Sequence, residues 1–146
     1  MQIKGLMMKI FLRIALLTFL SMTYAQATET ESPFKCNPTG NQSELNQCAF
    51  DDYTAADKKL NYTWKQLMNN FKADKTATAK LKAAQKAWLV FRDAEIDAMF
   101  ACDTKEDNCW GSMEPMQRFY EKAALTEART ARLQHYLNKG LGVAMD

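Results

Sequence analysis

Glycine and proline are scarce in this chain, and their scarcity limits the folds open to it more than any other feature. Only 5 glycines and 3 prolines occur among 146 residues. An all-β fold needs turn residues at short intervals, and collagen-like or low-complexity chains are rich in both, so the sequence argues against these classes. With 47% apolar and 25% charged residues, the chain is long enough for one globular domain.

The first helical pattern follows Gly40. The side chain of Asn41 can accept hydrogen bonds from backbone N–H groups of the first helical turn, while the side chain of Glu44 can reach back to the backbone N–H of the capping residue. This arrangement is known as a capping box. Apolar side chains then recur every three or four residues, which predicts one buried face. A break is expected near residues 74–76, because Asp and Thr are better helix caps than interior residues. The predicted buried face consists of Leu45, Cys48 or Ala49, Tyr53, Ala56, Leu60, Trp64, Leu67 and Phe71.

Two further helical patterns complete the predicted domain. Residues 75–101 contain neither glycine nor proline, and the third pattern begins near Ser112 and Pro115 and stops at Gly140. Three amphipathic helices predict a small antiparallel all-α bundle. The second stripe is expected to comprise Leu81, Ala84, Trp88, Phe91 and Met99, with Glu95 and Ile96 filling the intervening turn; the third comprises Met116, Phe119, Ala123, Thr126, Thr130, Leu133 and Leu137.

The first 27 residues have the pattern of an export signal. Three cations precede an apolar run at residues 14–22, and small residues follow it up to Ala27. A membrane anchor is the alternative, but a bilayer-spanning helix needs about 20 apolar residues, and this run is shorter. We therefore expect a periplasmic or secreted protein without a membrane anchor after cleavage. Its parts would be a signal peptide (1–27), a polar lead (28–40), a helical domain (41–140) and a tail (141–146).

Export makes disulfide bonds the expected state of the four cysteines, Cys36, Cys48, Cys102 and Cys109. Four cysteines allow three pairings, and the sequence alone does not choose among them. Local pairing is favoured, because Cys36 with Cys48 and Cys102 with Cys109 each bracket a short segment. Zinc is not expected, since the chain has no Cys-x2-Cys pair and His135 is its only histidine. No other metal or cofactor is expected.

The most specific motif lies in the second predicted helix, where residues 84–95 read AQKAWLVFRDAE. Residues 45–49 (LNQCA), 56–61 (ADKKLN) and 111–116 (GSMEPM) add to it. Together these motifs resemble the lysozyme inhibitor LprI N-terminal-like family from about residue 36 to residue 137. The resemblance implies an exported bacterial helical domain of a family whose named member inhibits lysozyme, which makes lysozyme an expected partner. The family commonly has cysteines where this chain has Ile96 and Glu121, so a Cys102–Cys109 bridge would be a relocated one that closes a loop.

Charge is distributed unevenly along the chain. Net charge is −5 over residues 28–57, +8 over 58–92, −6 over 93–127 and +2 over 128–146. Because the net charges of these four segments sum to −1, nucleic-acid binding is not expected. An acidic, disulfide-closed loop that displays a tryptophan would suit steered association with a basic lysozyme, whereas a solvated connector is the alternative. The predicted partner-binding residues are Asp103, Glu106, Asp107, Trp110 and Glu114.

Gln85, Trp88 and Arg92 share one face of the second predicted helix. They suit either a recognition patch for a sugar or carboxylate, or a packed cluster in which Arg92 pairs with an acid such as Asp57 or Glu95. The packed cluster is favoured, because residues on an apolar stripe usually pack. The other motif residues considered with them are Asp93 and Glu95.

Catalytic patterns are missing from the sequence, and we do not expect an enzyme. His135 has no candidate nucleophile, and the sequence has no phosphate-binding glycine loop, GxSxG or HExxH motif. The leading hypothesis is a reversible inhibitor of lysozyme. The alternative is a general envelope module that binds a cell-wall polymer or a protein partner through its lysine-rich helix faces.

Overall fold

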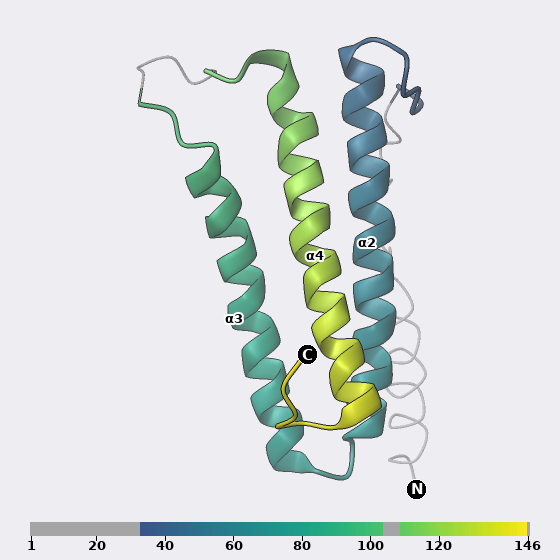
Figure 1. Ribbon diagram of the computed structural model, residues 1–146, viewed down its shortest axis with the longest axis vertical. Helices are drawn as coiled ribbons and strands as arrows, with labels where there is room; N and C mark the ends of the chain where they lie inside the picture. Colours follow the sequence, from purple (N-terminus) through teal and green to yellow (C-terminus); the bar gives the residue numbers. More distant parts are fainter. Residues whose placement is uncertain (1–32, 104–108, 146) are drawn as a thin grey trace, which may run out of the picture. The chain divides into compact units, whose positions relative to one another are not determined.

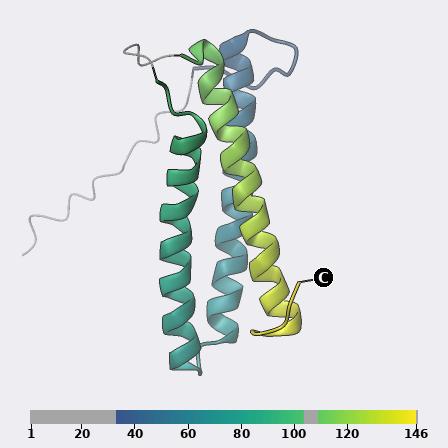
Figure 2. The same ribbon diagram turned by 60° about the vertical axis from the view of Figure 1, so that its left-hand side comes forward.

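Three long helices form the part of the chain that the computed structural model describes, residues 33–103 and 109–145. They are α2 (Gln42–Asn70), α3 (Lys75–Met99) and α4 (Glu114–Lys139), and a 3-10 turn, η1 (Gly111–Met113), precedes α4. Figures 1 and 2 show α3 running opposite to α2 and α4, which lie side by side. The prediction of an all-α antiparallel bundle is confirmed. The predicted signal peptide lies outside the described residues.

Local sequence signals set the helix ends. The Asn41 side chain accepts hydrogen bonds from the backbone N–H groups of Ser43 and Glu44, and the Glu44 carboxylate accepts from Asn41 N–H at 2.8 Å, so the predicted capping box is confirmed. Asp74 caps α3 by accepting from Ala77 N–H at 2.8 Å. Gly140 ends α4 with a φ of +90°, which L side chains rarely adopt. None of the helices within the described ranges is long and apolar enough to cross a membrane.

Small side chains bring α2 and α4 closest together. Ala49, Ala56 and Thr63 of α2 are buried, and α4 contributes buried Ala123, Thr126 and Thr130, so the two backbones can approach without a bulky layer between them. Larger side chains fill the core toward the α2–α3 turn, where all three helices contribute. That cluster comprises Leu60, Leu67, Leu81 and Leu133.

The buried face of α3 differs from the predicted one. Phe91 is 53% exposed and Met99 45% exposed, and Ala84 is also exposed. The side chains that turn inward are instead those of Leu81, Trp88, Arg92 and Ile96. The predicted stripe was wrong at these three positions because it followed the apolar residues, whereas the inward position of that turn is held by Arg92, whose guanidinium lies over the aromatic rings of Tyr53 and Trp88. Phe91 and Met99 consequently remain on the outside.

Two disulfide bonds join the cysteines locally, as the sequence favoured. Cys36 pairs with Cys48 and ties the N-terminal lead to the second turn of α2. Cys102 pairs with Cys109 and joins the two ends of the loop between α3 and η1. Helix α3 ends at Met99, two residues before the end of the predicted helical stretch 75–101. Phe100 then packs edge-on against Trp110, with ring centroids 5.3 Å apart.

We predict that Thr126→Val stabilises the protein by about 1 kcal/mol, because Thr126 Oγ1 is buried without a hydrogen-bond partner among the described residues. Valine keeps the shape and removes the unpaired hydroxyl. The matched control is Thr130→Val, since Thr130 Oγ1 donates to the Thr126 carbonyl at 2.9 Å; this variant is expected to lose about 0.5–1 kcal/mol. Urea unfolding with the disulfides intact measures both. Equal losses in the two variants would contradict this assignment.

Candidate protein-binding surface

The surface with the most features of a binding site is the loop end of the bundle, which we define as the start of α2, the last two turns of α3, residues 100–103 and 109–113, and the start of α4. Trp110 is 47% exposed although it rests on Phe100. Phe50, Met99 and Met113 are exposed on the same end. Exposed aromatic and methionine side chains grouped in this way are typical of protein interfaces.

A groove of about 700 Å³ runs between α3 and α4 at the loop end. Its lining includes the apolar side chains of Ile96, Pro115 and Phe119, together with Asn46 of α2 and Ser112 of η1. Asn46 Nδ2 donates to the Ser112 carbonyl at 3.3 Å, which joins η1 to α2. The groove is therefore built by all three helices together with η1, and apart from Gly111 its remaining lining is charged.

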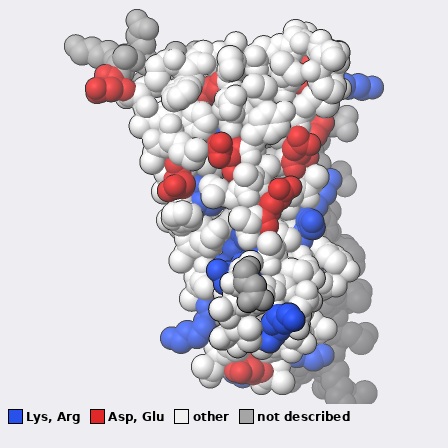
Figure 3. Space-filling view, in the orientation of Figure 1, with Lys and Arg blue, Asp and Glu red and all other residues white. Residues whose placement is uncertain are grey.

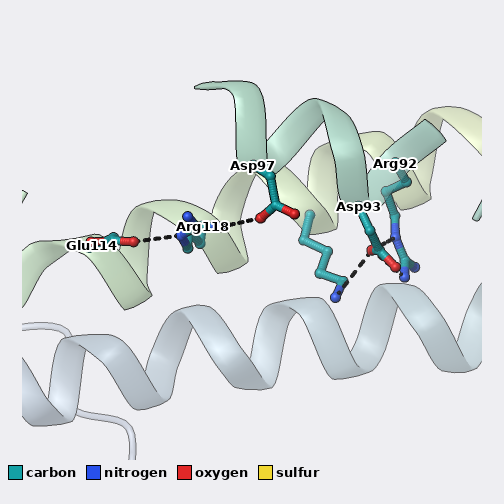
Figure 4. A network of polar contacts seen from close by, with 6 residues as sticks. Arg92, Asp93, Asp97, Glu114 and Arg118 are labelled. Carbon is teal, nitrogen blue, oxygen red and sulfur yellow. Dashed lines mark hydrogen bonds and ion pairs between the residues drawn. The ribbon is translucent and has the colours of Figure 1, made fainter. Parts of the chain in front are cut away.

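Arg118 links the two walls of the groove. Its guanidinium contacts Asp97 of α3 at 2.9 Å and Glu114 of its own helix at 2.7 Å (Figure 4). It also lies over the ring of Phe100, 5.1 Å from the centroid. The hydrogen bonds with Glu114 and then Asp97 raise the pKa of Arg118 above its ordinary value. Arg118 thus connects the end of α3, the start of α4 and the aromatic support of Trp110.

Asp93 forms a second link one turn before Asp97. Its carboxylate accepts from Arg92 Nε at 2.9 Å and contacts Lys122 Nζ of α4 at 3.4 Å (Figure 4). Burial by itself would raise the pKa of Asp93, but the hydrogen bond and charge of Arg92, together with Lys122, outweigh it and hold the pKa below its usual value. The stabilisation from this carboxylate is therefore present above the usual Asp pKa and is lost as the pH falls through the lowered one.

Gln85, Trp88 and Arg92 of the α3 motif face the interior of the bundle, whereas Asp93 and Glu95 are exposed. Arg92 is buried, with its guanidinium 5.3 Å from the ring centroid of Trp88 and 5.9 Å from that of Tyr53. Gln85 Oε1 accepts from Arg129 Nε of α4 at 3.0 Å. The acid paired with Arg92 is Asp93, whereas the sequence suggested Asp57 or Glu95. This placement gives Gln85, Trp88 and Arg92 contacts that join the three helices.

The predicted partner-binding residues differ in how accessible they are. Asp103 is exposed and Trp110 is half-exposed. Glu114 is held in the ion pair with Arg118, and 23% of its side chain is exposed. Glu106 and Asp107 lie outside the described residues. Sequence reasoning missed Arg118 and Lys122, although the four-residue spacing of Asp93 and Asp97 on α3 matches that of Arg118 and Lys122 on α4.

The bundle is electrically polarised along its helices. Figure 3 shows acidic side chains gathered over the loop end and most basic side chains toward the α2–α3 turn. Four acids near the loop end have neither an ion-pair partner nor a side-chain hydrogen bond in the part of the chain described: Asp52, Glu95, Asp103 and Glu121. The loop end therefore offers a binding partner carboxylates that accept hydrogen bonds and an aromatic ring for contact. Across the described ranges, no group of three His, Cys, Asp or Glu side chains is placed to hold a metal ion.

Comparison with known proteins connects the chain to one family. Residues 35–133 match the family model described as lysozyme inhibitor LprI. An uncharacterized protein, R02472, of Rhizobium meliloti (strain 1021) is 33% identical over 132 residues, which cover 83% of this chain and 91% of that protein. No solved structure matches the chain significantly. The family match includes all of α2 and α3, the groove and the loop end.

Proposed function

The chain belongs to the family of the lysozyme inhibitor LprI, and from this premise we propose that it is an exported, noncatalytic protein that inhibits lysozyme by reversible association. The observation that carries the proposal is the loop end, where a half-exposed tryptophan stands among acids without ion-pair partners in the described chain. Animal-type lysozymes are strongly basic, so complementary charge would speed their encounter with this end.

Trp110 is the proposed anchor of the interface. Tryptophan is among the residues that contribute most to binding energy when a partner covers them. Phe100 supports one edge of its ring, Arg118 lies over Phe100, and the Cys102–Cys109 bond restricts the loop. A side chain supported in this way loses little conformational freedom on binding, which favours affinity.

The proposal is tested by cell-wall lysis, followed as loss of turbidity, with lysozymes of several classes and the oxidised mature chain as titrant. We expect saturable inhibition that falls at least about tenfold in apparent affinity for the variant Asp103→Lys/Glu106→Lys/Asp107→Lys. The matched control reverses three charges far from the loop end, Lys58→Glu/Lys59→Glu/Lys65→Glu, and should inhibit like the unmodified protein. Lack of inhibition of every class, or equal loss in both variants, would overturn the proposal.

A second candidate function rests on the basic half of the bundle. Eight exposed lysines of α2, α3 and the turn between them have no ion-pair partner among the described residues, and such a surface suits an anionic envelope polymer. Cosedimentation with purified cell-wall polymer distinguishes this function, because the lysine variant above would lose it and the loop variant would keep it. The lysines are Lys58, Lys59, Lys65, Lys72, Lys75, Lys80, Lys82 and Lys86.

A further inference from the structure

Helix α3 carries an apolar row on the side that faces away from α2 and α4. Val90 is 66% exposed, and it stands in a row otherwise made of exposed alanines. Phe91 lies beside the row, 53% exposed. Water-exposed helix faces are usually polar, so a continuous apolar row suggests a surface that is covered by a partner. The row is Ala79, Ala83, Ala87, Val90, Ala94 and Ala98.

The spacing of this row reads the same in both directions. Its members follow one another at intervals of four, four, three, four and four residues. A row of this kind lines the seam between two helices, and alanine permits close approach of the backbones. Two copies placed antiparallel bring Ala79 opposite Ala98, Ala83 opposite Ala94, and Ala87 opposite Val90, so every apolar position meets another. The partner that this symmetry fits is a second copy of the same chain.

The charges beside the row agree with the same arrangement. Lysines flank its first half and acids flank its second half. In the antiparallel arrangement Lys82 comes next to the partner's Asp97, and Lys86 next to the partner's Asp93, on one side of the seam. Lys80 comes next to the partner's Glu95 on the other side. A parallel arrangement would instead place like charges together, which is unfavourable.

We propose that α3 pairs with α3 of a second copy in an antiparallel, two-fold symmetric dimer, with the alanine row as its seam. The acids involved remain accessible despite their internal ion pairs, because 75% of the Asp97 side chain and 53% of the Asp93 side chain are exposed. Phe91 of each copy packs beside Ala84 of the other. The loop ends of the two copies then lie at opposite ends of the paired helices, so each remains available to a lysozyme molecule.

Sedimentation equilibrium of the oxidised mature chain over a wide concentration range tests the dimer. We expect a mass that rises from monomer to dimer, and a dissociation constant raised at least about tenfold by Val90→Asp, which buries a charge in the seam. Because Val90 is exposed within its own chain, the helix content of this variant should not change, and neither should its unfolding midpoint at concentrations where both proteins are monomeric. A monomer at all concentrations, or a dimer unaffected by Val90→Asp, would overturn the proposal.

A charge exchange tests the direction of the pairing. Lys80→Glu and Glu95→Lys should each weaken the dimer, and the double variant should restore it, because the two positions face each other only in the antiparallel arrangement. Neither residue has an ion-pair partner among the described residues, so the fold of each chain should be kept. Failure of the double variant to restore association would contradict the antiparallel register.

Discussion

Leu133→Ala is expected to lower the free energy of unfolding by about 3–4 kcal/mol. Leu133 is fully buried on α4 and packs with Leu60 and Leu67 of α2 and Leu81 of α3. Truncation removes a side chain that touches all three helices, and it leaves a cavity that long helices fixed at both ends cannot readily close. Urea unfolding followed by far-ultraviolet circular dichroism measures the loss directly.

The matched control for this variant is Leu89→Ala. The same atoms are removed, but Leu89 is among the exposed apolar residues of α3 and lies off the alanine row. Its loss should be below about 1 kcal/mol. Similar losses at the two positions would mean that the leucine cluster is not the centre of the core.

Removing the Cys36–Cys48 bond by replacing both cysteines with alanine is expected to cost about 3 kcal/mol in the loop-entropy account. The bond closes a separation of 12 residues and fixes the lead against α2. Most of the effect arises in the unfolded chain, which gains freedom when the bond is absent. The unfolding midpoint in urea should therefore fall while the native helix content stays the same.

Reduction provides the control for the disulfide prediction. The Cys36→Ala/Cys48→Ala variant still contains Cys102–Cys109, so adding a reductant should lower its stability further. The bond between Cys102 and Cys109 closes a separation of 7 residues, and its contribution is about 2 kcal/mol in the same account. An unfolding midpoint unchanged by loss of Cys36–Cys48 would show that the lead is constrained by other contacts.

The sequence predicts the helix ends correctly where signals within one turn of the chain determine them. The cap at Asn41, the break at Asp74 and the stop at Gly140 act within one turn of the chain, and each was found. The stripes of α2 and α4 were also found, because their apolar residues are separated clearly from charged ones. The buried face of α3 was predicted only in part, at Leu81 and Trp88, since the inward position of Arg92 depends on its contact with Tyr53 of α2 as well as with Trp88.

The residues of the candidate site divide in the same way, into those that one loop of the sequence predicts and those that only the packing of helices brings together. Asp103 and Trp110 were predicted from the composition of one loop, and both are exposed. Arg118 was missed because its role is to join Asp97 and the support of Trp110, which only the packing of α3 against α4 brings together. The groove has no sequence signal of its own, since three helices and η1 line it.

Titration calorimetry of the oxidised mature chain with lysozyme, at low and at high salt, measures the proposed association directly. We expect a complex with one lysozyme per chain, weakened by salt and weakened at least about tenfold by Trp110→Ala. Absence of binding to every lysozyme class at low salt would contradict it. So would an affinity that Trp110→Ala leaves unchanged.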